Sequence, residues 1–401
     1  MTGDRQRRPG AARMLALLAV AELLGMSLWF TAAAVSPELA ARWGLSTAEA
    51  GWLTGAVQLG FVAGTALAAL LNLADLVPDR VWFAGSALAA AAANAALVAV
   101  PGFRSALIAR FLTGLFLAGV YPPAMKMIAT WFERRRGLAI GTVVGALTLG
   151  KAAPYLLKAA GGAGATRVVL AASAAAVIAA LLVAAGYRPG PYPFERRPFS
   201  WRLAAEVVRD RRTRLAIGGY LGHMWELYAM WTWVPAFVAA SMAARSAAAG
   251  SAAASPGGWV DLVAFGAIGA GGLGCVWGGW YADRAGRART VNLAMAASGA
   301  CSLGVGLAFG APLAVVAAVT WLWGFFVVAD SAQFSALVTE VAPRHAVGTA
   351  LTLQTSIGFL LTLATIELVP LLADTLGWPL AFPVLALGPA AGIAAIRRLK
   401  H

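Results

Sequence analysis

The sequence predicts an all-α membrane protein with twelve transmembrane helices in two six-helix bundles related by pseudo-two-fold symmetry. Three observations predict this fold class. Of the 401 residues 60% are hydrophobic and only 12% are charged, whereas a soluble domain has about 25% charged residues. Twelve apolar segments are long enough to cross a bilayer, and the two halves of the chain share motifs at a fixed spacing.

Short turns rich in Pro, Gly and charge separate the twelve segments. A helix needs about 20 residues to cross the hydrocarbon core. The segments run approximately over 13–35, 48–71, 80–100, 104–130, 137–159, 166–186, 214–240, 258–281, 290–309, 312–338, 347–372 and 378–397. The first exceeds the roughly 7 to 15 residues of a signal-peptide core. We therefore expect it to be retained as a span.

The basic residues indicate how the chain is oriented. Most of the 31 Lys and Arg lie in alternate loops, including those next to both termini. The positive-inside rule then predicts a multi-pass protein of the cytoplasmic (inner) membrane with both termini in the cytoplasm. Because these charges follow the loops and do not cover one face, the net charge of +14 predicts contact with the lipid bilayer and no nucleic-acid partner.

The longest basic loop divides the spans six and six. We predict an N-terminal bundle over 1–186, a basic cytoplasmic linker over 187–213 and a C-terminal bundle over 214–401. Apolar linker residues such as Leu203 and Val207 lie on the inner leaflet in one interpretation. In the other the linker is solvated.

Internal repetition supports two related halves. Two pairs of residues recur 204 positions later in the same order, as expected of a duplicated unit. They are Glu22/Trp29 with Glu226/Trp233, and Asp79/Arg80 with Asp283/Arg284.

The stretch GGWYADRAGRAR fits the pattern G-x-x-x-D-R-x-G-R/K-x-R/K between spans eight and nine. With the span count and the basic central loop, it makes the sequence resemble the major facilitator superfamily over nearly the whole chain. The resemblance implies that these loops close the cytoplasmic side. The first-half loop, LLNLADLVPDR, lacks the leading Gly, which leaves its gating role open. The residues concerned are Gly279, Asp283, Arg284, Gly286 and Arg287 in the second half, and Asp79 and Arg80 in the first.

Two further stretches bear on this resemblance. RFLTGLFLAG places Arg110 four residues before Gly114, similar to an R-x-x-x-G pattern on span four whose arginine is tied to coupling. Span five lacks the Gly-Pro pair common in drug antiporters of the family. Its spaced glycines resemble the nitrate/nitrite and cyanate porter branches, although they equally suit helix packing. They are Gly137, Gly141, Gly145 and Gly150.

Ionisable residues inside the spans are the main functional signal. Each costs at least about 2.5 kcal/mol at the centre of a bilayer, so it usually faces a cavity or a partner. Glu22, His223 and Glu226 fall near the midplane, and the last two share one helical face. A carboxyl and an imidazole both exchange protons, which suits proton coupling. The alternative is an interhelical hydrogen bond that aligns span seven.

Lys126 and Asp330 occupy equivalent positions with opposite charges on spans four and ten. One interpretation pairs them across the cavity as an inner gate, and another has them hold the two ends of a zwitterion. Lys126 also has the reach to extend to the interface. Lys151 is a further deep cation, and Gln354 offers a neutral hydrogen bond.

These residues predict a secondary transporter that moves a small anionic or zwitterionic solute by alternating access with proton coupling. The alternative is a proton-driven efflux antiporter for drugs or amphipathic metabolites, and a less favoured one is a transport-inactive receptor. No compact nucleophile, metal or phosphate constellation indicates an enzyme. The two cysteines indicate no redox or metal chemistry. We expect a monomer without a cofactor, whose partners are the solute, protons and lipid.

Overall fold

Apolar helices make up the described architecture. The computed structural model describes residues 10–132, 136–160, 164–192, 200–250, 257–343 and 345–399, and within these ranges there are helices but no strand. Residues 193–199 of the predicted linker lie outside the described part.

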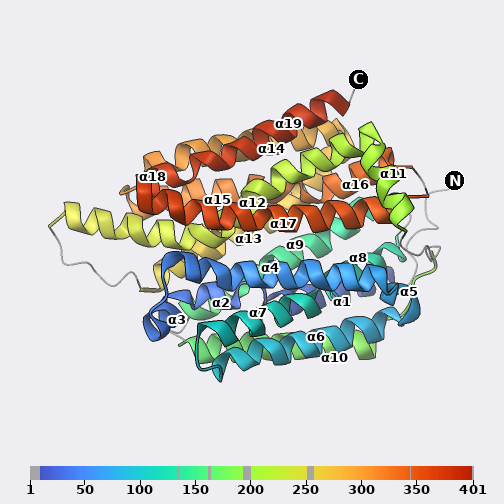
Figure 1. Ribbon diagram of the computed structural model, residues 1–401, viewed down its shortest axis with the longest axis horizontal. Coiled ribbons are helices and arrows are strands. Elements are labelled where there is room, and N and C mark those ends of the chain that lie inside the picture. The colour runs from blue at the N-terminus through green and yellow to red at the C-terminus, as the bar shows by residue number, and fades with distance from the viewer. Residues whose placement is uncertain are drawn as a thin grey trace.

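In its described residues, the first half of the chain contains ten α-helices. They are α1 (Ala11–Met26), α2 (Thr31–Ala34), α3 (Ser36–Trp43), α4 (Thr47–Leu70), α5 (Leu73–Leu76), α6 (Asp79–Ala95), α7 (Phe103–Leu117), α8 (Tyr121–Ala129), α9 (Arg136–Ala159) and α10 (Ala165–Gly186). In Figure 1 these blue to green helices lie together in the lower half of the molecule.

The described part of the second half contains nine α-helices. They are α11 (Trp201–Arg209), α12 (Arg211–Ala248), α13 (Gly257–Ala285), α14 (Arg287–Gly304), α15 (Leu313–Ala329), α16 (Ser331–Val341), α17 (Val347–Leu376), α18 (Trp378–Ala381) and α19 (Leu387–Leu399). Helices α12 and α14 to α19 form the upper half of Figure 1, and both chain ends lie with α11 at one end of the bundle.

The predicted fold class is confirmed. Eleven helical segments in the described ranges are long and apolar enough to cross a membrane. The remaining predicted span, 13–35, is divided into α1 and α2 by turns at Ser27–Phe30, so neither piece reaches the required length. The predicted domain boundaries stay a prediction, and α12 already begins at Arg211.

Local sequence explains where key helices begin. Ser46 caps α4: its hydroxyl accepts a hydrogen bond from the Glu49 backbone N–H, and the Glu49 carboxylate accepts one from the Ser46 N–H at 2.8 Å. This is a capping box. Asp210 caps α12 by accepting from the Thr213 N–H at 2.7 Å.

The linker helix α11 packs against α12 and α17. Val207 is completely buried in the hydrophobic core and Leu203 packs against it, whereas Val208 is exposed. The side of α11 that carries Leu203 and Val207 therefore faces protein. The two interpretations of the sequence predicted lipid or water there.

Glycines let helices approach closely both within and between the halves. A Cβ at Gly60 or Gly114 would overlap the backbone of the facing helix in the α4–α7 contact. Between the halves, α9 packs on α13 and α4 on α17. A Cβ at Gly145 would lie 3.1 Å from the Gly272 carbonyl oxygen, and one at Gly272 would lie 3.1 Å from that of Gly145. The two halves thus meet backbone to backbone at this point.

Candidate functional site

Lys151 lies buried where the two halves meet. It is on α9, and its ammonium donates a 2.5 Å hydrogen bond to the Tyr228 hydroxyl of α12. The ammonium also lies 4.2, 4.7 and 5.4 Å from the ring centroids of Trp29, Tyr228 and Trp231. Each desolvated cation–π contact stabilises a charge by up to about 2 kcal/mol. Aromatic faces and one hydroxyl therefore hold this cation.

More rings extend this arrangement across both halves. The centroids of Phe61 and Phe359 are 4.7 Å apart, and Phe359 lies 5.2 Å from Tyr228 and 5.6 Å from Trp29. We call the resulting set the aromatic cluster. Its members are Trp29, Phe30, Phe61, Tyr121, Tyr228, Trp231 and Phe359.

Glu22 stands beside this cluster without a hydrogen bond. Its side chain on α1 is fully buried, and neither carboxyl oxygen has a hydrogen-bond partner in the described ranges. Helices α1 and α9 touch at the next residues, since a Cβ at Gly150 would overlap the Leu23 carbonyl. Glu22 and Lys151 flank that contact and interact electrostatically. Burial of a carboxyl without a donor is costly, and the predicted part of Glu22 in coupling stays a prediction.

A polar contact between the halves lies near the rings. Thr362 on α17 donates a hydrogen bond to the Gln58 side-chain oxygen on α4. Both residues are completely buried, and the Gln58 amide nitrogen has no partner among the described residues. The indole N–H groups of Trp29 and Trp231 likewise have no partner among the described residues, so the site contains three unpaired donors besides Lys151.

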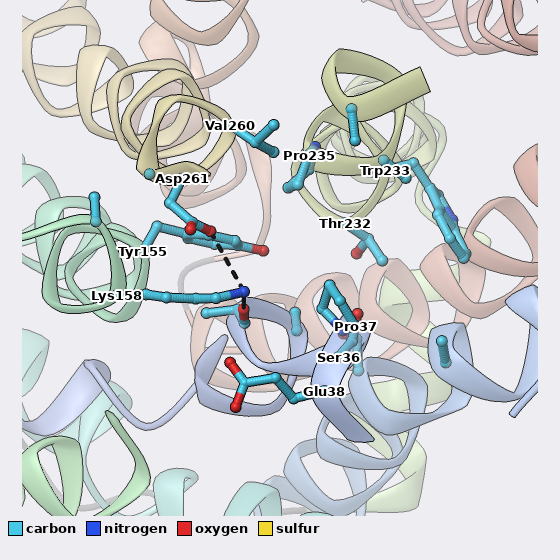
Figure 2. Close-up of a pocket in the computed structure, with 18 residues that line it drawn as sticks. Ser36, Pro37, Glu38, Tyr155, Lys158, Thr232, Trp233, Pro235, Val260 and Asp261 are labelled. Carbon is cyan, nitrogen blue, oxygen red and sulfur yellow. Dashed lines mark hydrogen bonds and ion pairs between the residues drawn. The ribbon is translucent and has the colours of Figure 1, made fainter. Parts of the chain in front are cut away.

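A vestibule of about 500 Å³ opens between the halves. Its lining comes from α2, α3, α4, α9, α12 and α13, and Figure 2 shows residues of α3, α9, α12 and α13 around it. Helix α3 lies at the end of the bundle opposite α11 (Figure 1). The residues labelled in Figure 2 are Ser36, Pro37, Glu38, Tyr155, Lys158, Thr232, Trp233, Pro235, Val260 and Asp261.

The vestibule floor lies one helical turn from Lys151. Tyr155 and Thr232 line the vestibule, and each comes four residues after a member of the buried contact, Lys151 and Tyr228 respectively. Four residues rise about 6 Å along a helix. A solute in the vestibule is therefore separated from Lys151 by about one layer of side chains.

An ion pair joins the halves within the vestibule. The Lys158 ammonium lies 3.8 Å from the Asp261 carboxylate and donates a 2.8 Å hydrogen bond to the Ala34 carbonyl. The Tyr155 hydroxyl is buried and has no partner among the described residues, and Figure 2 shows it next to this pair.

Arg110 binds to the turn between α1 and α2. Its guanidinium donates to the carbonyls of Leu28 at 3.0 Å and Trp29 at 2.6 Å, and to the Asn94 side-chain oxygen at 2.6 Å. In the broken helix the Leu28 carbonyl accepts only a long backbone hydrogen bond among the described residues, from the Thr31 N–H at 3.5 Å, and Arg110 supplies further donors to this turn. This geometry gives Arg110 a positioning role for Trp29, whereas its predicted coupling role stays a prediction.

His223 and Glu226 bind separate partners inside the second half. Glu226 accepts hydrogen bonds from the Trp323 indole and the Ser298 hydroxyl, both at 2.7 Å. The His223 ring lies 2.9 Å from the Asp330 carboxylate and 2.8 Å from the Ser331 hydroxyl. The structure therefore joins His223 with Asp330, and their predicted part in coupling stays a prediction.

Lys126 does not meet Asp330 in this structure. Its ammonium lies 3.1 Å from the Asp79 carboxylate of its own half, and Asp330 has His223 as its neighbour. The interpretation that pairs Lys126 with Asp330 is thus wrong for this conformation, because each finds a nearer charge within its own half. Lys126 is 32% exposed, in keeping with a place near the end of its span.

The second-half loop forms contacts within its own half. Arg287 donates to the Glu340 carboxylate at 2.5 Å and to the Gln333 side-chain oxygen at 2.9 Å. Arg284 covers the Trp280 ring at 4.1 Å, and Gly286 has φ +85°, a conformation that favours glycine. The other predicted loop residues have open surroundings: Asp283 and Arg80 are exposed, and a Cβ at Gly279 would meet nothing within 4 Å in the described structure.

Gln354 is buried on α17, and its side-chain oxygen has no partner among the described residues. Gly145 and Gly150 pack against Gly272 and Leu23, while Gly137 has open space around it. Helix packing thus accounts for two of the four glycines on span five, and the porter-branch resemblance stays a prediction.

Several site residues have no sequence prediction behind them. Tyr228 and Trp231 follow Glu226 in the aromatic stretch of span seven, and Tyr155 and Lys158 follow Lys151 at helical spacing. That spacing is the signal that would have found them, because residues four apart lie on one face. Asn94 offers only the weaker signal of a lone amide in an alanine-rich span.

Comparisons with known proteins bear on family and fold. The sequence model of the Major Facilitator Superfamily matches residues 17–366. Among solved structures, the E. coli fucose:proton symporter, FucP, matches with a TM-score of 0.67 and 14% identity, over 98% of this chain and 100% of its own. At this identity the likeness concerns the fold alone. No curated protein matches the sequence.

Proposed function

Because the chain belongs to the major facilitator superfamily, as its resemblance indicated, we propose that it is a secondary active transporter for a small anionic or zwitterionic solute. It works by alternating access with coupling to protons. Family and fold support transport across a membrane. The nature of the solute is our inference from the buried site.

The single observation that carries this proposal is Lys151. It is buried at the contact between the halves, and its ammonium binds one hydroxyl and three aromatic faces. A buried cation normally has an anionic partner. Glu22 makes no hydrogen bond to it, so a negatively charged group of the solute is the natural direct partner.

The surroundings of Lys151 support alternating access. The vestibule reaches to within one helical turn of it from one end. The Lys151–Tyr228 and Gln58–Thr362 hydrogen bonds both join one half to the other. Motion of the halves relative to each other would break these contacts and expose the site, as a repeat-based transporter requires.

Orientation and coupling belong to the same proposal. The basic loops support a cytoplasmic-membrane protein with both termini inside, which makes the vestibule the outward opening. Glu22, Glu226 and Asp330 are buried carboxyl groups that offer places for a proton. We also propose that the protein acts as a monomer.

A second candidate function is proton-driven efflux of amphipathic compounds. The observation in its favour is the aromatic cluster, whose rings suit an apolar body. A cation at its centre disfavours the positively charged drugs that many efflux proteins export. An anionic amphipathic metabolite would satisfy both features.

Binding and flux measurements test the proposal. We expect that anionic metabolites raise the melting temperature of the purified protein, and that the Lys151→Met variant loses this response. Flux in proteoliposomes with and without a pH gradient then tests coupling. If only cationic or neutral compounds are bound, equally well by Lys151→Met, the proposed function is refuted.

A further inference from the structure

The side chains of the buried site restrict the chemical class of the solute more narrowly than the charge of Lys151 alone does. Within the described part of the site, one cation, Lys151, and one carboxyl without a hydrogen bond, Glu22, lie beside seven aromatic rings. Arg110 already donates three hydrogen bonds to protein oxygens. Lys151 is thus the cation best placed to bind a ligand there.

We propose that this site binds a monocarboxylate with an apolar or aromatic body together with one proton, the carboxylate at Lys151 and the proton at Glu22. This inference deepens the proposed function and rests on it. It selects one solute class from the broader anionic and zwitterionic set, and it places the proton in the first half of the chain.

The charges of the polar groups favour a single carboxylate. Lys151 is the cation of the site, and its other donors are neutral: the Tyr228 hydroxyl, the Gln58 amide, and the indole N–H groups of Trp29 and Trp231, which have no partner among the described residues. The second charge of a dicarboxylate would therefore lack a cation, and a compact inorganic oxyanion would leave the rings uncovered. A sugar would leave many hydroxyls against apolar rings, and each unpaired one costs free energy. The rings instead match an apolar body by burial and stacking.

Charge balance accounts for the proton. We assign a positive charge to Lys151 and a negative charge to Glu22 in the empty site, so that the two sum to zero. A bound monocarboxylate would leave an excess negative charge at low dielectric, which is unfavourable. One proton from the solution outside converts Glu22 to the neutral acid and restores the balance. Deprotonation on the inside returns that proton with the released carboxylate, so one proton and one monoanion cross together.

Other titratable groups near the pair are already engaged or lie at the edge. Tyr121 of α8 and Tyr228 of α12 are the hydroxyl groups that face it. Helix α13, packed on α9, brings Cys275 and Asp261, and Asp261 pairs with Lys158. Helix α10, packed on α1, carries only Arg167, at its start.

Glu22 also differs from the other deeply buried acids, Glu226 and Asp330. Glu226 already accepts two hydrogen bonds, and Asp330 lies beside His223. Among the described residues, Glu22 has neither a donor nor a hydrogen-bonded cation. Its charge is therefore the one that a ligand at Lys151 would leave uncompensated.

Three probes of one shape test the ligand class: mandelate, its neutral amide mandelamide, and the zwitterion phenylglycine. Phenylpyruvate, 4-methyl-2-oxopentanoate, malate and nitrate complete the set. Binding is measured by tryptophan fluorescence and thermal shift on the purified full-length protein. We expect the three monocarboxylates, mandelate, phenylpyruvate and 4-methyl-2-oxopentanoate, to bind. Lys151→Met should lower their affinity about 10- to 100-fold, the range for a charge-assisted hydrogen bond. Arg167→Met, an exposed matched change, should leave binding unaltered.

The proton is tested with Glu22→Gln, which has the shape of the protonated acid. In the wild type we expect affinity for mandelate to fall with rising pH, by up to about tenfold per unit, because binding takes up one proton. Glu22→Gln should remove this dependence, keep mandelate exchange between liposomes and medium, and lose accumulation driven by a pH gradient. Glu367→Gln, the same change on α17, should keep the pH dependence of affinity, the exchange of mandelate and its accumulation driven by a pH gradient. Protein-free liposomes correct for passive leak.

Different results would refute the solute class and the assignment of the proton to Glu22. If none of the three monocarboxylates binds, or if phenylglycine, malate or nitrate binds better, the solute class is wrong. Lys151-dependent binding of another anion would still support the proposed function. If Glu226→Gln abolishes the pH dependence and Glu22→Gln does not, the proton lies where the sequence predicted, and our assignment to Glu22 is overturned.

Discussion

Replacing Arg110 by methionine tests how the protein holds its broken first span. The variant loses three hydrogen bonds, to the carbonyls of Leu28 and Trp29 and to Asn94. An interhelical hydrogen bond in a bilayer contributes about 0.6 to 2 kcal/mol, which gives about 2 to 6 kcal/mol for three. Methionine avoids burying a charge, which offsets part of this. We therefore expect the free energy of unfolding to fall by about 2 to 4 kcal/mol.

The measurement is reversible unfolding in mixed micelles by SDS titration, followed by tryptophan fluorescence. Arg110→Lys, which keeps the charge and fewer donors, should fall between the wild type and Arg110→Met. Arg104→Met removes an exposed arginine from the same helix and should change stability by less than about 0.5 kcal/mol. If Arg110→Met is as stable as Arg104→Met but loses proton-driven uptake, the positioning role is refuted and the coupling role predicted from the sequence gains support.

Two further predictions concern helix packing and the ion pair between Lys126 and Asp79. Gly114→Ala should reduce the yield of folded protein severalfold in size-exclusion chromatography, because its Cβ overlaps a facing backbone, whereas Gly85→Ala, with nothing within 4 Å in the described structure, should express normally. In transport assays the Lys126→Ala defect should be matched by Asp79→Ala, with the double variant no worse than either, because these residues pair with each other. Rescue of Lys126→Ala by Asp330→Ala would instead support a gate between the halves.

Segment-level features were predictable from the sequence because they depend on local composition. Helical spans follow from hydropathy and length, and the burial of Glu22, Lys151 and Glu226 follows from their positions within apolar segments. The turn at Ser27–Phe30 was not predictable. This stretch contains neither Pro nor Gly, and the arginine that stabilises it comes from another helix.

Side-chain partners were beyond prediction for a related reason. The repeat places Lys126 and Asp330 at equivalent positions, but equivalence under a pseudo-symmetry does not make two residues face each other. Their partners depend on how each helix is rotated and on which charges its neighbours carry. Likewise, the rings around Lys151 come from two other segments of the chain, the turn after α1 and helix α12, so the residue spacing along span five does not predict them.

The backbone contact between Gly145 and Gly272 has a mechanical consequence. Farther along the same helix pair, a Cβ at Gly258 would meet the Ala159 backbone at 3.1 Å, and residues 145 and 159 are separated by about 21 Å along α9. If α9 tilts on α13 about the contact between Gly145 and Gly272, each degree of tilt moves Ala159 relative to Gly258 by about 0.4 Å. A modest tilt would then separate Gly258 from Ala159 while Gly145 and Gly272 stay in contact. A large change in access to the site would therefore need little sliding of α9 along α13.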